Sequence, residues 1–361
     1  MGRINSAHES RALNGGDRSW VASTRTLSLL LERVANAFFS SQNSPRCCTA
    51  ASALTQFSNL LETSVARRMP EKEWSFIKDC AHGHKKTLQA AQQDQMDEAD
   101  RLADEIWRRV RSRTLSPEGQ LLMQVFILPA DAYLLYKRQD YQGARQLILH
   151  ASAIDRRLAT ELGFDLFSVH RLQLGCNLLR IHTRLAEDRA AMRLGGMLLD
   201  YLELRVDPPS DELLCARAVL DCVPDAILEY YFEKICGELA IVLAGHTDVR
   251  TSELFQPLIH HASAASCPSV GFASHAHAWL RMKQLALRGE IESLLESAIE
   301  LLQLGKMAEP SLWFATILEV AGVCRSLGTE ARGLADRMVA EASAHADAPW
   351  AMKQAATAGQ A

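Results

Sequence analysis

The chain of 361 residues lacks the patterns that mark membrane proteins and secreted proteins. No window of about eighteen residues is both apolar and uncharged, so the sequence predicts no transmembrane helix. The nine cysteines are scattered along the chain, and none of them forms a CxxC pair. An odd number of unpaired thiols is typical of a reducing compartment rather than of secretion. We therefore expect a cytoplasmic protein with free cysteines.

The sequence also has little net charge. It contains 39 Lys and Arg residues and 43 Asp and Glu residues, which gives a formal net charge of −4. Such a small charge on a long chain creates no strong field that would capture nucleic acid or an anionic membrane. We expect neither of them as a partner.

Motifs of the common enzyme classes are missing as well. The chain has no Gly-x-Ser-x-Gly nucleophile turn, no phosphate-binding glycine loop, no dinucleotide fingerprint and no His-Glu-x-x-His. We therefore assign no catalytic residue and no cofactor. These absences favour a non-catalytic protein, and an all-α enzyme with an unrecognised pocket is the alternative.

Candidates for metal ligands come from an acidic run and from histidines. The run Asp97, Glu98 and Asp100 could suggest a Mg²⁺ site, but no second acidic motif matches it, and it resembles a charged helix face. Asp79, His82 and His84 form the densest group of possible ligands, since carboxylates and imidazoles both bind Zn²⁺. On a regular helix, His82 and His84 would point about 200° apart, so a shared site requires a helix break at Gly83. Two further groups have no ligand spacing either: His260-His261 and His275-Ala276-His277. We assign no metal site.

Helical periodicity dominates the chain, and no alternating strand pattern of useful length is present. Apolar residues between Ile291 and Leu302 repeat at the spacing of one helix face. Ser116-Pro117 and Met69-Pro70 have the residue types of helix starts. The sequence thus predicts an all-α fold. Among its expected helices are 48–68, 70–112 with a possible break near Gly83, 116–138, 141–162, 165–187 and 271–288.

The segment Asp131 to Arg157 has the most specific pattern. Small and aromatic residues flank its polar turn at Gln139-Asp140: Ala132, Tyr141, Ala144 and Ala151. Small side chains let two helix backbones approach closely, so this spacing predicts a tight helical hairpin. The segment resembles one unit of the tetratricopeptide-repeat (TPR) family. That resemblance implies stacked hairpins whose superhelix binds other molecules in its groove.

A second, weaker unit extends the resemblance. Ala321, Gly333 and Ala340 repeat the spacing of the small residues in the first unit. We therefore expect stacked antiparallel hairpins, a TPR-like α-solenoid, over residues 116–345. The helices in 21–115 would form an N-terminal cap or bundle. Residues 1–20 would be a disordered tail and 346–361 a flexible C-terminal tail.

Two predicted helices carry narrow strips of polar side chains. The first strip, on helix 165–187, consists of His170, Gln173, Asn177, Arg180 and Arg184. The second strip, on helix 271–288, consists of His277, Arg281, Gln284 and Arg288. Guanidinium and amide groups bind carboxylates well, so both strips are candidates for a partner-binding groove. The alternative is that each strip is the solvated face of an amphipathic helix.

Together these features predict a non-catalytic intracellular scaffold or regulatory protein. It would bind a protein or peptide, acidic or with a free carboxylate, in a groove lined by hydrogen-bond donors. A regulator of the same fold, whose superhelix responds to a small ligand or a signalling peptide, is an alternative.

Overall fold

The computed structural model describes residues 24–41, 49–203, 220–221, 223–262, 274–306, 309–345 and 347–358. Within these residues the fold is all-α, as predicted, with no strand, and no helix is long and apolar enough to cross a membrane. The helices are α1 (Thr24–Ser41), α2 (Thr49–Ala66), α3 (Glu71–Gln92), α4 (Met96–Arg111), α5 (Pro117–Lys137), α6 (Tyr141–Thr160), α7 (Phe167–Arg184), α8 (Asp188–Glu203), α10 (Asp225–Leu243), α11 (Val249–Phe255), the 3-10 helix η1 (Gln256–Leu258), α12 (Ser274–Arg288), α13 (Ile291–Gln303), α14 (Pro310–Ser326), α15 (Thr329–Ser343) and α16 (Trp350–Ala358).

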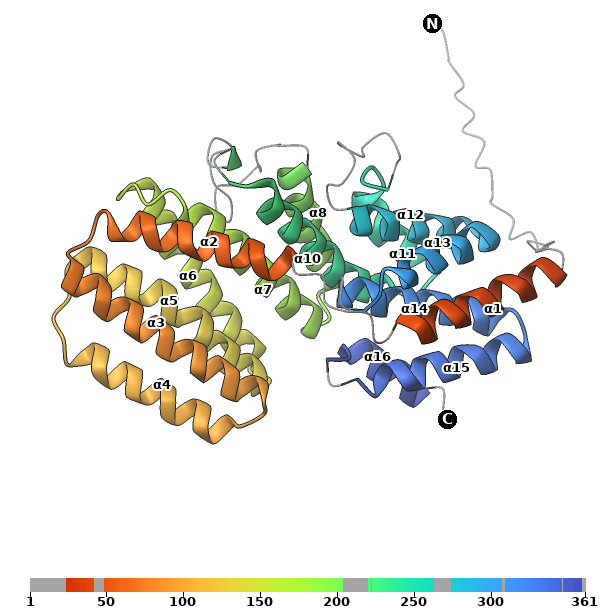
Figure 1. Cartoon of the computed structure of the whole chain (residues 1–361), viewed down its shortest axis with the longest axis horizontal. Coiled ribbons are helices and arrows are strands. Elements are labelled where there is room, and N and C mark those ends of the chain that lie inside the picture. The colour runs from red at the N-terminus through yellow and green to blue at the C-terminus, as the bar shows by residue number, and fades with distance from the viewer. Residues whose placement is uncertain are drawn as a thin grey trace, which may run out of the picture.

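Four helical hairpins of the described chain close with the same turn. They pair α3 with α4, α5 with α6, α7 with α8, and α12 with α13 (Figure 1). Each turn has one residue with positive φ: Asp94, Gln139, Ala186 and Gly289. The next residue then donates its backbone N–H to the carbonyl five residues back, as Asp140 does to Leu135. This is the Schellman arrangement, and it reverses the chain within two or three residues.

The hairpin expected at Asp131 to Arg157 is formed by α5 and α6. Its small residues Ala132, Ala144 and Ala151 are all buried, so the two backbones can approach closely. The side chain of Asp140 accepts the N–H of Gly143 at 2.9 Å and caps α6.

The small residues of the expected second unit do not have the same role. Gly333 and Ala340 are exposed, and a Cβ atom on Gly333 would have no neighbour within 4 Å. The side of α15 that packs against the core carries other residues, among them Ala331 and Ala335. Spacing alone did not show which side of this helix is buried, and the prediction for Gly333 and Ala340 was wrong.

The expected break at Gly83 is also absent. Helix α3 continues through Gly83 and ends nine residues later at Gln92, just before the turn of Asp94. A Cβ at position 83 would lie 3.0 Å from Cδ1 of Ile106 on α4. The glycine therefore allows α4 to pack closely against α3.

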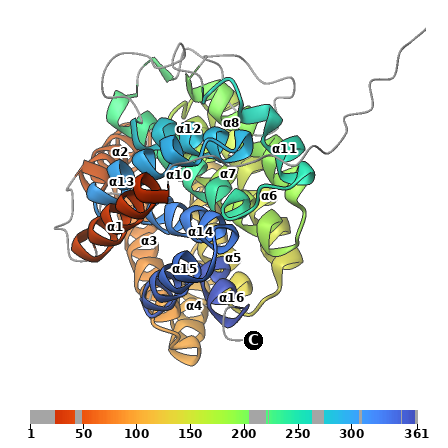
Figure 2. The same cartoon turned by 90° about the vertical axis from the view of Figure 1, so that its right-hand side faces the viewer.

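Both ends of the described chain pack against the C-terminal hairpins. Helix α1 lies against α13 and α15 and not with α3 and α4 (Figures 1 and 2). Residues 350–358, expected in a flexible tail, form α16, which buries Met352 against its neighbours. The expected tail 1–20 lies outside the described residues.

Candidate functional site

Five helices, α2, α3, α5, α7 and α10, surround a cavity of about 470 Å³, which we call the α7 cavity. Its volume falls in the range of small-ligand sites, about 300–1,000 Å³. Most of its wall is apolar or aromatic and includes Phe57, Trp74, Val125 and Phe126. Helix α2 reaches from α3 to α10 and supplies one side of the wall (Figure 1).

The wall on α5 is shaped by a proline inside the helix. Pro129 has no N–H, so it cannot donate the usual helical hydrogen bond to the carbonyl of Val125. Both residues line the cavity. The aromatic rings of Trp74 and Phe126 lie 6.3 Å apart and extend the apolar surface across α3 and α5.

The first polar strip forms the opposite wall. Four of its five residues line the α7 cavity: His170, Gln173, Asn177 and Arg180. They remain partly exposed, whereas the neighbouring positions on α7, such as Leu172, Cys176 and Leu179, are buried in the core. The cavity thus has a polar wall and an apolar wall.

His170 is held by a buried carboxylate. Its Nδ1 lies 2.8 Å from Oδ2 of Asp155, a fully buried residue on α6. Burial alone would lower the pKa of His170, but the charge and hydrogen bond of Asp155 outweigh it and raise that pKa. Because Asp155 occupies Nδ1, Nε2 is the ring nitrogen left for a ligand.

Arg180 is oriented by neighbours on two helices. Its Nε donates to Oε1 of Glu238 on α10 at 2.6 Å, and its Nη1 donates to Oδ1 of Asn177 at 3.5 Å. Glu238 offsets part of the positive charge and fixes the plane of the guanidinium group.

Positive charge still predominates at the cavity. Three cationic side chains, Lys78, Lys85 and Arg180, line it with one carboxylate, Glu62. Lys78 and Glu62 form an ion pair at 2.7 Å, and Lys85 is exposed. A carboxylate of a ligand would therefore find a favourable field here.

His84 is a polar group without a partner in this wall. Its side chain lines the cavity, only 2% of its surface is exposed, and neither ring nitrogen has a hydrogen-bond partner. Burial lowers its pKa to about 4, so the ring is neutral near pH 7 and offers one donor and one acceptor. Buried polar atoms are rarely left unpaired in folded proteins, and a bound ligand would satisfy these two.

The remaining strip residues lie outside the cavity. Arg184 donates its Nε to the hydroxyl of Tyr136 at 2.8 Å, and its guanidinium group lies 5.6 Å from the ring of Trp350 on α16. No residue of α12 lines the α7 cavity, so the second strip does not share it with the first. His277 of the second strip is buried, while Arg281 and Arg288 are exposed.

The sequence did not predict several of the residues that line the α7 cavity. His84 was considered only with Asp79 and His82, which are both exposed; His82 also lines the α7 cavity, whereas Asp79 does not. Trp74 and Phe126 are apolar residues whose sequence surroundings suggest no more than core packing. Only the contact between α3 and α5 makes them one wall.

Comparisons of the chain with protein-family models, with curated proteins and with solved structures find no match. The function therefore has to be inferred from the residues of the sites themselves.

Proposed function

We propose that this protein is a non-catalytic scaffold or regulatory protein that binds a peptide segment of another protein in the α7 cavity. One observation carries the proposal: a single cavity has an aromatic wall from α3 and α5 and a polar wall from α7. Peptide-binding grooves commonly combine an apolar pocket for an anchor side chain with polar groups that fix the main chain or a carboxylate.

The chemistry of the walls suggests the kind of peptide. Trp74 and Phe126 suit an aromatic or aliphatic anchor. The excess of cationic side chains suits a nearby acidic residue or a free C-terminal carboxylate. His84 and Gln173 would supply hydrogen bonds to the peptide main chain.

We further propose a TPR-like arrangement of the hairpins. The turns of the first three hairpins, at Asp94, Gln139 and Ala186, lie 45 and 47 residues apart. A TPR unit has about 34 residues, so the proposed likeness concerns the stacking of hairpins and not their length. Cys80, Cys176, Cys236 and Cys324 are free and buried, which supports a cytoplasmic location as part of the proposal.

A cavity with added negative charge tests the proposal. The double variant Lys85→Glu with Gln173→Glu places two carboxylates on opposite walls without removing a side chain of the core. The full-length wild type is screened against a library of short peptides that contain one aromatic residue and an acidic residue or a free C-terminus. The affinity of the enriched peptides is then measured by fluorescence anisotropy.

We expect the double variant to weaken the binding of these peptides at least tenfold, which corresponds to about 1.4 kcal/mol. The matched control is Arg281→Glu with Arg288→Glu, which reverses two charges on the second strip outside the cavity. The control should bind like the wild type. If the wild type enriches no peptide, or if both double variants bind equally well, the α7 cavity is not the binding site.

A further inference from the structure

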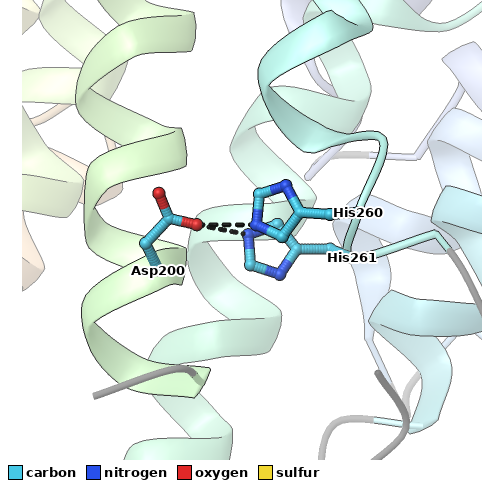
Figure 3. A group of neighbouring side chains, drawn as sticks. All are labelled: Asp200, His260 and His261. Atoms are coloured by element: carbon cyan, nitrogen blue, oxygen red, sulfur yellow. Dashed lines mark hydrogen bonds and ion pairs between the residues drawn. The ribbon is translucent and has the colours of Figure 1, made fainter. Parts of the chain in front are cut away.

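A second group of polar side chains lies where α8 meets the turn that follows η1. Figure 3 shows His260 and His261 directing their rings toward the same oxygen of Asp200, which belongs to α8. Nε2 of His260 lies 2.7 Å and Nε2 of His261 lies 3.1 Å from Oδ1 of Asp200. In a regular helix, adjacent side chains diverge by about 100° and could not converge in this way. The turn brings both rings to one side, with their centroids 3.8 Å apart.

A second carboxylate fixes the tautomer of His261. Nδ1 of His261 is hydrogen-bonded to Oε2 of Glu203, one turn beyond Asp200 on α8. A carboxylate oxygen can only accept, so Nδ1 carries the proton and donates it. In the neutral ring, Nε2 then presents a lone pair to Oδ1 of Asp200, so two acceptors face each other. His261 is fully buried, and this contact is stable only with a cation or a second proton on that nitrogen.

The two carboxylates on α8 also favour a cation. Asp200 and Glu203 lie one turn apart on the same helix, so a bound cation would offset part of the negative charge of both.

His277, a residue of α12, holds the backbone of His261 in position. Its Nδ1 donates to the backbone carbonyl of His261 at 2.9 Å, which holds that residue in place. Its Nε2 lies 3.4 Å from Oε1 of Glu203, and neither of these buried atoms has a hydrogen-bond partner. The polar groups around His261 are thus not fully satisfied by one another.

From these contacts we infer that Asp200, His260 and His261 bind a first-row divalent transition metal, with Zn²⁺ the best fit. Two imidazole nitrogens and one carboxylate oxygen are a common set of protein ligands for zinc sites that also bind water. In such a site, neighbouring ligand atoms lie about 3.3 Å apart. Metal binding would therefore lengthen the distance from Oδ1 of Asp200 to Nε2 of His260 by roughly 0.6 Å, and the distance to Nε2 of His261 by roughly 0.2 Å.

Exposure gives the metal access to the site. His260 and Asp200 have 42% and 38% of their side-chain surface exposed, so water can supply the remaining ligand. Glu203 is a positioning residue, because it orients His261 through Nδ1 in the way that carboxylates orient metal-bound histidines. The site ties α8 to the turn after η1. It does not depend on peptide binding in the α7 cavity.

Metal titration of the full-length protein without a histidine tag tests this inference. The protein is treated with EDTA, dialysed and titrated with Zn²⁺ by calorimetry and with Co²⁺ by visible absorption. We expect one equivalent to bind, with a Co²⁺ spectrum typical of nitrogen and oxygen ligands. His260→Gln and Asp200→Asn should each weaken binding at least tenfold, and Glu203→Gln should weaken it by about 10–100-fold.

His150→Gln serves as the control, since His150 is an exposed histidine on α6. It should bind Zn²⁺ like the wild type. The same concentration of Zn²⁺ should raise the melting temperature of the wild type and of this control by more than that of His260→Gln. Circular dichroism checks that each variant is folded. Absence of saturable binding to the wild type would show that a proton, not a metal, bridges His261 and Asp200. Equal affinity in wild type and His260→Gln would place the metal elsewhere.

Discussion

Buried polar side chains of this protein differ in whether they have hydrogen-bond or ion-pair partners. Lys283 and Glu319 are both fully buried and form an ion pair, with Nζ 3.0 Å and 3.2 Å from the two carboxylate oxygens. Glu319 also accepts the backbone N–H of Gly245 at 3.1 Å, so its charge has several partners. His84 has none among the described residues. Lys283 and Glu319 complete a structural network, whereas both ring nitrogens of His84 lack a hydrogen-bond partner.

His84 should make the stability of the free protein depend on pH. Its folded-state pKa, about 4, lies below the usual 6.5. The unfolded chain therefore binds a proton more readily, and the contribution of His84 to stability, complete above pH 6.5, is lost as the pH falls toward 4. We expect the stability of the wild type relative to His84→Leu to fall by about 3 kcal/mol between pH 7 and pH 4.

Urea unfolding of both proteins at several pH values measures this difference, and other titrating groups cancel in the comparison. His82→Gln, an exposed position on the same helix, controls for the loss of a histidine. A difference between wild type and His84→Leu that stays constant across this pH range would mean that His84 is not held neutral by burial.

At the scale of the elements, glycines decide where helices and turns touch. Gly322 on α14 faces the turn after α10, and a Cβ there would lie 2.8 Å from the carbonyl oxygen of Gly245. Gly333 on α15 faces open space. The two glycines lie in neighbouring helices, yet only the first permits a close approach of backbone to backbone.

Alanine at these two positions should therefore have opposite effects. Gly322→Ala pushes the Gly245 turn away from α14 and should destabilise the protein by about 1–3 kcal/mol. Gly333→Ala adds a better helix former without a clash and should stabilise it by up to about 1 kcal/mol. Urea unfolding of the two variants measures both free energies. Equal effects would contradict the contact between Gly245 and α14.

Local patterns allowed the prediction of most helices and of one wall of the α7 cavity. Ser116-Pro117 starts α5 as expected, and its hydroxyl accepts the N–H of Gly119. The first strip was visible because half-buried polar residues on one helix face are a local property. The aromatic wall was not, since Trp74 and Phe126 meet only through tertiary packing. Asp200 lies sixty residues before His260, and no local pattern connects them.

At the scale of the whole molecule, the N-terminal helix completes the C-terminal core. The fully buried Phe38 stacks on Trp313 with ring centroids 5.6 Å apart, and Nε1 of Trp313 donates to Oγ of Ser41 at 2.9 Å. The apolar face of α1, which includes Val34, covers α13 and α15. The C-terminal hairpins therefore need α1 for their full stability.

Two adjacent phenylalanines allow a matched test of this role. Phe38 is buried, whereas 39% of Phe39 is exposed. We expect Phe38→Ala to destabilise the protein by about 3–5 kcal/mol and Phe39→Ala by about 1 kcal/mol or less. Thermal and urea unfolding measure the loss, and limited proteolysis should show faster cleavage near α13 to α15 in Phe38→Ala. Equal losses in both variants would mean that α1 does not complete the core.

The contact between α1 and α14 also sets an order of events during synthesis. Ser41 and Trp313 are separated by 272 residues. At about 5–20 residues per second, a ribosome needs roughly a quarter of a minute to a minute to make the intervening chain. During that time the apolar face of α1 is already outside the ribosome while its partners do not yet exist. Helix α1 therefore stays without this partner until α14 has been made, and the yield of folded protein depends on keeping its apolar face from other contacts during that time.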